Sequence, residues 1–270
     1  MKSILEAPFI VDMTRALDNM YSHGWDERNG GNVSVMLDPA EVAEYLDTSL
    51  VLRRIPMTFA EPALDGKIFI VTGTGKYFKN AKYDPAANLG IVRLAEGGAV
   101  AELLWGFTDG GKFTSEFPAH IMSHAVALAK SPDHRVVMHC HPTNIIAMTF
   151  VHSLDSREFT VDIWRTCTEC LVVFPDGINV LPWMLCGTNE IGVATAEAMK
   201  TARMVVWAQH GIYGTGKDLD ETFGLIETAE KGAEIYMKTF GHPILQTITD
   251  DNLREIEAGF GVKAREGWLD

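Results

Sequence analysis

Two histidines at the end of an apolar run are the residues of this sequence best suited to chemistry. Residues 136–138 are apolar and lead into His139 and His141, and alternate residues of a β-strand point to one face of the sheet. The spacing therefore predicts two imidazoles aligned toward a divalent metal. Two ordinary histidines at a strand end give the same pattern, so the pair alone does not decide between these interpretations.

A second strand-like run supplies a third possible ligand. Residues 204–208 are apolar, and His210 follows them after Gln209. Catalytic zinc sites use three protein ligands and keep one position open, so the three histidines together favour a metal centre.

Glu116 is the candidate for a fourth ligand or a general base. A helix is predicted to begin at this residue, capped by Thr114 or Ser115, and the helix dipole alone explains a carboxylate there. His120 and His124 lie one turn apart in the same helix. We expect them to pack or to form hydrogen bonds, because no glutamate follows His120 as in a metalloprotease motif.

Two glycine-rich loops suit a bound anion. Residues 29–32, Asn-Gly-Gly-Asn, permit positive φ and let successive amides converge, although a tight turn into a strand explains them equally well. Residues 72–76, Thr-Gly-Thr-Gly-Lys, follow a predicted strand, but Tyr77 stands where a Walker motif has Ser or Thr. We therefore expect phosphate contact through the Thr74 hydroxyl and the local amides.

Composition restricts the possible partners. The chain has 270 residues, 47% of them hydrophobic, and a formal net charge of −13, which argues against binding to nucleic acid or to anionic membranes. An acid and a proline interrupt the first residues where a signal peptide would stay apolar, and no apolar run approaches about 18 residues. These features favour a cytoplasmic protein whose partner is a small molecule.

Four cysteines are too few for a disulfide framework in a chain of this length. Cys167 and Cys170 form a C-x-x-C pair, but they precede residues 171–174, which have the composition of a strand. A redox pair instead opens a helix after a strand, so we do not expect redox or metal chemistry here.

Helices alternate with strands along the chain, which predicts an α/β fold with helices covering a central sheet. A predicted hairpin over residues 89–105 makes the sheet mixed or antiparallel, and residues 38–66 are expected to leave the core. Helices are predicted over residues 6–23, 116–130 and 156–166. Another begins at Pro142 and runs through Phe150, one over 188–201 is capped by Thr188, and a long one capped by Asp218 or Asp220 ends near 240. The other predicted strands are 33–35, 67–71, 136–141, 171–174, 178–183 and 203–209.

A metal ion beside a phosphate site suits carbonyl chemistry, because the ion can stabilise the enediolate left when a neighbouring carbon–carbon bond breaks. The combination resembles the class II aldolase/adducin family. The motifs that carry the resemblance are weak singly and specific together: Asn29-Gly30-Gly31-Asn32, Thr72-Gly73-Thr74-Gly75, Thr114-Ser115-Glu116, His139-Cys140-His141 and His210-Gly211, with longer blocks at 24–29, 84–90, 169–177 and 220–226.

The resemblance covers nearly the whole chain and implies one domain over residues 1–270. The implied fold has three layers, α/β/α, with a mixed, mostly antiparallel central sheet. The implied reaction is the reversible cleavage of L-rhamnulose 1-phosphate to dihydroxyacetone phosphate and L-lactaldehyde. The implied assembly is a fourfold homotetramer with active sites at the subunit interfaces.

The resemblance also implies roles for individual residues. His139, His141 and His210 would bind one Zn²⁺ per subunit, and Glu116 would be a resting ligand that swings away to act as general acid and base. Glu169 would come from a neighbouring subunit and handle the aldehyde oxygen, a role that the residues alone do not suggest. The phosphate would be held by Asn29, Gly31, Asn32, Thr74, Thr114 and Ser115.

Two positions depart from the family pattern, because Thr74 replaces a usual serine and Pro142 replaces a small residue. Neither change removes a ligand. The rival interpretations are an aldolase or epimerase for a fuculose or ribulose phosphate, and a non-catalytic binding module of the adducin kind. The binding module is disfavoured because all three histidines and Glu116 are present.

Overall fold

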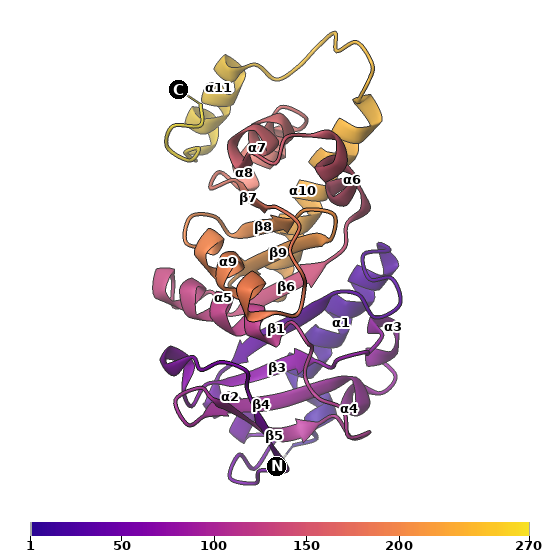
Figure 1. The fold of residues 1–270 in the computed structure, drawn as a ribbon, viewed down its shortest axis with the longest axis vertical. Helices are drawn as coiled ribbons and strands as arrows, with labels where there is room; N and C mark the ends of the chain where they lie inside the picture. Colours follow the sequence, from indigo (N-terminus) through magenta and orange to yellow (C-terminus); the bar gives the residue numbers. More distant parts are fainter. Residues whose placement is uncertain (1, 270) are drawn as a thin grey trace.

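The computed structural model describes residues 2–269 and builds them around one nine-stranded sheet (Figure 1). Strands β7 and β8 pair in parallel and every other neighbouring pair is antiparallel, which confirms the mixed, mostly antiparallel sheet. The order across the sheet is β2 (Arg53–Pro56), β5 (Val100–Gly106), β4 (Leu89–Ala95), β3 (Ile68–Thr72), β1 (Asn32–Leu37), β6 (Val136–Cys140), β9 (Gly211–Gly216), β8 (Met204–Trp207) and β7 (Ile178–Leu181).

Helices cover both faces of this sheet, as the alternation along β6 requires. Val136 and Met138 pack into one core with α1 (Pro8–Ser22), α6 (Thr143–Val151) and α10 (Leu219–Thr239). Val137 points the other way and packs with α5 (Phe117–Lys130) and α9 (Asn189–Met199). The expected three-layer arrangement is therefore confirmed.

The remaining helices lie around these layers. In Figure 1, α7 (Ser156–Trp164), α8 (Thr168–Val173) and α11 (Asp250–Phe260) gather beyond β7, at the end of the molecule away from β5. Among residues 2–269, no helix has both the length and the apolar character needed to cross a membrane. The short helical pieces are η1 (Ile4–Glu6), α2 (Pro39–Ala43), η2 (Pro62–Leu64), α3 (Phe78–Ala81) and α4 (Pro85–Asn88).

Side-chain caps set the starts of two of the predicted helices. Thr188 accepts a hydrogen bond from the amide of Ile191 at the start of α9, and Asp218 accepts one from Glu221 at the start of α10. These contacts satisfy amide groups that have no partner inside the helix. Of the two predicted caps for the long helix, Asp218 is the one used.

The predicted strand over 171–174 is wrong, because Thr168–Val173 forms α8. A short apolar run fits a buried strand and one buried turn of helix equally well, and here Cys170 and Leu171 face the core. The correction also removes the argument made from this strand against redox chemistry. Burial raises the pKa of the Cys170 thiol to about 12, which makes a reactive thiolate unfavourable at this position.

Two strands and one of the longer helices are present that the sequence analysis did not predict. Strand β9 follows His210 directly, and α11 lies beyond the last predicted helix. Strand β2 pairs with β5 at the edge of the sheet, so residues 38–66 do not lie wholly outside the core as expected. Alternate residues of β2 are exposed, which weakens its hydrophobic signal.

Candidate active site

Three neighbouring strands bring the central side chains of the site into one row. In the register of the sheet, His139 on β6 lies opposite Asn32 on β1 and opposite Tyr213 on β9. Residues directly opposite each other in antiparallel strands present their side chains on the same face. The ring of His139 stacks on that of Tyr213 with centroids 4.4 Å apart.

The other two histidines lie just outside the strands, where backbone contacts fix them. His141 follows β6, and its amide donates to the carbonyl of Trp25 at 2.8 Å. His210 lies in the turn between β8 and β9, next to Gln209, which adopts a positive φ of 57°. The Gln209 side chain donates to the carbonyl of Thr149 at 3.0 Å, so this unusual turn is anchored to α6.

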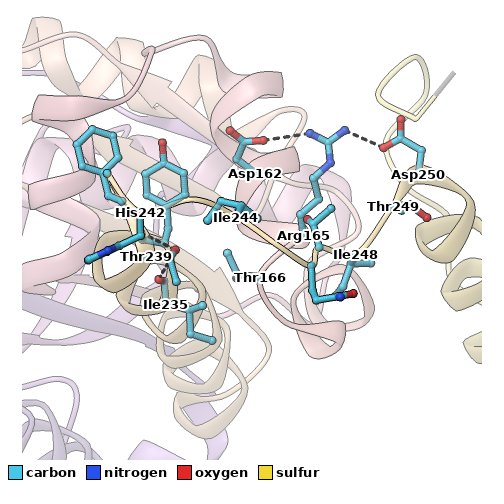
Figure 2. A pocket seen from close by; sticks show the side chains of 15 residues that line it. Asp162, Arg165, Thr166, Ile235, Thr239, His242, Ile244, Ile248, Thr249 and Asp250 are labelled. Carbon is cyan, nitrogen blue, oxygen red and sulfur yellow. Dashed lines mark hydrogen bonds and ion pairs between the residues drawn. The ribbon is translucent and has the colours of Figure 1, made fainter.

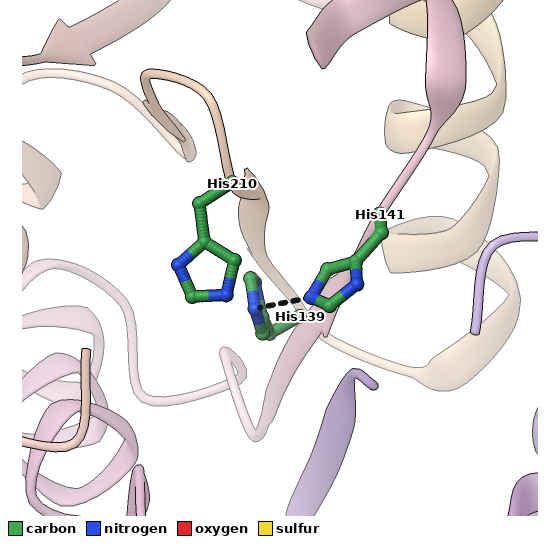
Figure 3. Close-up of side chains that lie close together, drawn as sticks. All are labelled: His139, His141 and His210. Atoms are coloured by element: carbon green, nitrogen blue, oxygen red, sulfur yellow. Dashed lines mark hydrogen bonds between the residues drawn. The ribbon is translucent and has the colours of Figure 1, made fainter. Parts of the chain in front are cut away.

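The three imidazoles converge as a ligand set (Figure 3). One ring nitrogen from each of His139, His141 and His210 lies within 4.8 Å of the others, and the Nε2 atoms of His139 and His141 are 3.3 Å apart. Two nitrogen ligands of a tetrahedral zinc ion are separated by about 3.3 Å.

The hydrogen bonds of the outer ring nitrogens explain why this set fits a cation. Nδ1 of His139 donates to the carbonyl of Ile212 at 3.0 Å, and Nδ1 of His141 donates to Glu27 at 2.8 Å. A neutral imidazole has one proton, so both facing Nε2 atoms carry lone pairs. Two lone pairs repel each other at this distance unless a cation or a proton lies between them. Metal-binding histidines characteristically donate a hydrogen bond from the ring nitrogen that does not bind the metal, as these two do.

Burial keeps the histidines in the form that binds metal. Burial lowers the pKa of His139 well below its ordinary value, and the neighbouring rings of His141 and His210 act in the same direction. Burial also lowers the pKa of His210 to about 4. Near neutral pH both rings are therefore uncharged, with lone pairs available for coordination.

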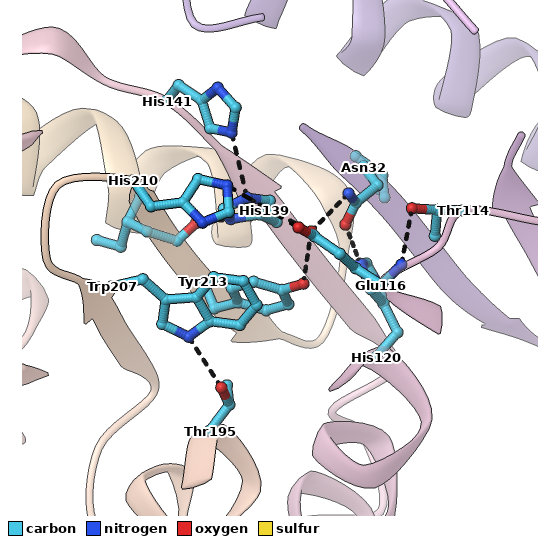
Figure 4. A network of polar contacts seen from close by, with 12 residues as sticks. Asn32, Thr114, Glu116, His120, His139, His141, Thr195, Trp207, His210 and Tyr213 are labelled. Carbon is cyan, nitrogen blue, oxygen red and sulfur yellow. Dashed lines mark hydrogen bonds and ion pairs between the residues drawn. The ribbon is translucent and has the colours of Figure 1, made fainter. Parts of the chain in front are cut away.

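Glu116 lies beside the histidines and is held by two donors (Figure 4). Its Oε2 accepts hydrogen bonds from Asn32 Nδ2 at 2.8 Å and from Tyr213 Oη at 3.0 Å. The same oxygen is 3.5 Å from His139 Nε2, and Oε1 is 3.9 Å from His210 Nε2. Burial raises the pKa of Glu116, while the hydrogen bonds from Asn32 and Tyr213 act to lower it.

The predicted cap of this helix is corrected by the structure. Glu116 itself occupies the N-cap position of α5, and its side chain turns into the site instead of capping the helix. Thr114 Oγ1 accepts from the amide of Glu116 at 3.2 Å, which fixes the backbone that carries the carboxylate. The helix begins at Phe117, one residue later than expected.

The predicted phosphate residues lie on three segments that meet at one end of strands β1 and β3. An antiparallel bridge joins Gly73 to Phe113, and the amide of Thr74 donates to the carbonyl of Lys112. Asn29, Thr74 and Ser115 are exposed, whereas Thr114 and Asn32 are buried. The side chain of Asn32 is already engaged with Glu116 and with His120, which sequence reasoning did not foresee.

Glu169 is exposed on α8, which packs against α7, α10 and α11. Its carboxylate accepts a hydrogen bond from Cys167 Sγ at 2.7 Å. Among the described residues, neither cluster of possible metal ligands includes Glu169. Within the described part of a single chain, Glu169 is thus not brought to the histidine cluster.

Several site residues were missed from the sequence. Glu27 orients His141, Tyr213 binds Glu116, and Gln209 shapes the turn at His210. Cys186 lies within 4.8 Å of ligand atoms of both Glu116 and His210, from a loop before α9. Each of these contacts joins residues far apart in the chain, so only the strand order could have revealed them.

An open cleft of about 470 Å³ borders the histidines, with Glu27, His141, Gln209 and His210 in its wall. A larger cavity of about 650 Å³ lies between α7, the end of α10 and the segment after it (Figure 2). Arg165 in that cavity is paired with both Asp162 and Asp250, so its charge is already neutralised. The smaller cleft is the candidate active site, because His141 and His210 of the histidine cluster line it.

The fold and this ligand set define a class of protein, and comparison with known sequences agrees. Residues 11–237 match the family described as Class II Aldolase and Adducin N-terminal domain, so the chain belongs to this family.

Individual relatives narrow the comparison. The chain is 55% identical to a rhamnulose-1-phosphate aldolase from Listeria monocytogenes, over 99% of this chain and 98% of that protein. A protein of the same name from Enterococcus faecalis is 52% identical over 99% of this chain and 96% of its own length. Another from Klebsiella pneumoniae is 47% identical over 100% of this chain and 99% of its own length.

Solved structures agree with the fold. A sugar-phosphate aldolase from Thermotoga maritima superposes with a TM-score of 0.74 and 28% identity, over 87% of this chain and 97% of that one. An L-fuculose 1-phosphate aldolase gives a TM-score of 0.60 at 19% identity, over 93% of this chain and 95% of that one, which supports the fold alone.

Proposed function

We propose that this chain is a zinc-dependent aldolase that reversibly cleaves L-rhamnulose 1-phosphate to dihydroxyacetone phosphate and L-lactaldehyde, as a step in L-rhamnose degradation. The observation that carries the proposal is the convergence of three histidines with the buried carboxylate of Glu116. The near-complete coverage of relatives with this name supports the choice of sugar phosphate.

In the proposal, His139, His141 and His210 hold one Zn²⁺ per subunit. A divalent cation there supplies the positive charge that stabilises negative oxygens of the substrate as the carbon–carbon bond breaks. Imidazole ligands also suit cobalt and nickel, so the choice of zinc rests on the resemblance.

Glu116 carries the proton that the reaction needs. In cleavage, the C4 hydroxyl gives its proton to Glu169 of a second copy of the chain, the C3–C4 bond breaks, and its electron pair stays on the three-carbon fragment. Glu116 then gives a proton to C3 of that fragment, and it takes the proton back in the reverse direction. Because Oε2 already accepts two hydrogen bonds, Oε1 is the oxygen available to carry the proton.

The remaining residues bind and orient the substrate. Asn29, Gly31, Asn32, Thr74, Thr114 and Ser115 hold the phosphate, and Asn32 can offer only its second amide proton, since the first is bound by Glu116. Glu169 from a second copy of the chain acts at the aldehyde oxygen. This role requires the homotetramer with interface active sites, and the exposure of Glu169 on α8 is compatible with it. The chain acts as a single domain in the cytoplasm.

The experiment is release of dihydroxyacetone phosphate by the purified protein, before chelation, after chelation and after return of zinc. We expect release from L-rhamnulose 1-phosphate that is lost on chelation and restored by zinc. L-fuculose 1-phosphate is the comparison substrate for cleavage, and formation of the C4 epimer from L-ribulose 5-phosphate tests the epimerase alternative. No release from zinc-loaded protein, or faster turnover of a comparison substrate, would contradict the proposal.

A further inference from the structure

A chain of buried polar side chains extends from Glu116 into the interface between β1 and α5. Asn32 and Ser34 are alternate residues of β1, and His120 and His124 lie one turn apart on α5, so each pair faces the other element. Ser34 and His120 are completely buried, and His124 is 1% exposed. Burying a polar group without a hydrogen bond destabilises the fold, so a buried chain of polar side chains needs an explanation.

The contacts form one continuous path. Asn32 Nδ2 donates to Glu116 Oε2 at 2.8 Å, and Asn32 Oδ1 contacts His120 Nε2. Ser34 Oγ lies 2.7 Å from His120 Nδ1 and 2.8 Å from His124 Nε2. Within the described chain, Nδ1 of His124 has no hydrogen-bond partner, so the path ends there.

The proton order along this path is determined from its first member. Since the Asn32 amide nitrogen donates to the carboxylate, its carbonyl faces His120, and His120 Nε2 must donate to it. Burial keeps His120 neutral by lowering its pKa, so its Nδ1 is an acceptor and Ser34 donates to it. The Ser34 oxygen then accepts from His124 Nε2, which completes the order.

We propose that His120 is a positioning residue for Glu116, which holds the Asn32 amide in the orientation that donates to the carboxylate. Ser34 and His124 fix the tautomer in which His120 can do so. The inference rests on the proposed role of Glu116 as the proton carrier.

The reversed orientation of the Asn32 amide would change the hydrogen bonds of Glu116. An asparagine amide that turns over exchanges its nitrogen for its oxygen, and two oxygens would then face each other at Glu116 Oε2. The carboxylate would lose one of its two donors there, and Oε1 would no longer be the only oxygen free to exchange a proton. Outer residues of this kind are worth about 10–100-fold in activity.

The test compares His120→Phe, which removes the donor, with His120→Gln, which can place an amide N–H near the position of Nε2. We expect H120F to lower kcat by about 10–100-fold with unchanged bound zinc, and to raise KM as well, because Asn32 also offers an amide proton to the phosphate. H120Q is expected to restore most of kcat. Ser34→Ala is a smaller change at the far side of His120, and it is also expected to lower kcat. This variant tests the inference if H120F does not fold.

A double-variant cycle separates positioning from general damage. If His120 acts through Glu116, adding H120F to Glu116→Gln causes little further loss, whereas independent effects multiply. Multiplied losses, or wild-type kcat in folded, zinc-loaded H120F and S34A, would overturn the inference. If E116Q itself keeps wild-type turnover, the proposed role of Glu116 fails instead, and the His120 inference fails with it.

Discussion

The individual side chains of the site are common types, and their neighbours determine what each can do. Glu27 and the carbonyl of Ile212 take the outer protons of His141 and His139, which leaves the inner nitrogens free for a metal. Tyr213 and Asn32 take one oxygen of Glu116. His152, by contrast, pairs with Asp162 and is in neither cluster of possible metal ligands among the described residues.

Asp26, beside Glu27, gives a prediction about pH. Its side chain is buried and neither oxygen has a well-formed hydrogen bond in the described structure. Burial raises its pKa from 3.8 to about 7, although the backbone amide of Phe78 acts to lower it. Between these values the folded protein binds more protons than the unfolded chain, so this group makes stability fall as pH rises from about 4 to 7. We expect Asp26→Asn to be more stable than wild type by about 1–3 kcal/mol above pH 7.

The measurement is the unfolding midpoint of both proteins at pH 5, 6, 7 and 8. The difference between them should grow with pH and level off above the pKa of Asp26. Asp133→Asn, at an exposed position, is the control and should give no such trend. A difference that is constant with pH would contradict the assignment.

At the scale of the elements, the close approach of the loop before β1 to strand β6 shapes the metal centre. Gly31 has φ of +73°, and a Cβ atom there would lie 2.9 Å from the carbonyl oxygen of His139. Gly24 has the same φ of +73° but has open space around it. Alanine substitution at Gly24 would therefore add backbone strain alone, whereas the same substitution at Gly31 would add strain and a clash with strand β6.

Gly31→Ala should displace the segment that carries His139 and His141, whereas Gly24→Ala should add only strain of about 1–2 kcal/mol. We expect G31A to lose zinc about tenfold or more faster during dialysis than wild type, with G24A unchanged. Zinc content after timed dialysis measures this. Equal retention by both variants would show that the close approach is not needed.

The elements also show what sequence can and cannot reveal. The strand that carries His139, the cap at Thr188 and one of the two caps expected for the long helix, Asp218, follow from local patterns and were predicted correctly. Residues 171–174 were not, because four apolar residues carry too little periodicity to separate a strand from a helical turn. The pairing of His139 with both Asn32 and Tyr213 depends on strand order, which is a property of the whole sheet.

At the scale of the whole molecule, Glu169 is the residue that one chain leaves unused. It is exposed on α8, an element that packs on α7, α10 and α11. If each active site combines Glu116 of one copy with Glu169 of another, E116Q and Glu169→Ala should each be nearly inactive alone and should complement each other in mixed assemblies. Random mixing of equal amounts leaves about a quarter of the sites with both residues intact.

The measurement is turnover after the two variants are unfolded and refolded together. The control mixes E116Q with His139→Ala, both changes expected in the same site of the same chain, because those side chains are in contact at 3.5 Å. Restored activity in the first mixture should clearly exceed that in the control. Equal activity in the two mixtures, or wild-type turnover by E169A alone, would exclude the role of Glu169 across an interface.

The central claim is that Glu116 moves a proton at the carbon next to the carbonyl, and hydrogen exchange measures this without the full reaction. Zinc-loaded enzyme is incubated with dihydroxyacetone phosphate alone in D₂O, and loss of the carbon-bound proton is followed by NMR. We predict exchange by wild type and a loss of about 100-fold or more in E116Q that still contains zinc. Undiminished exchange in zinc-loaded E116Q would contradict the account.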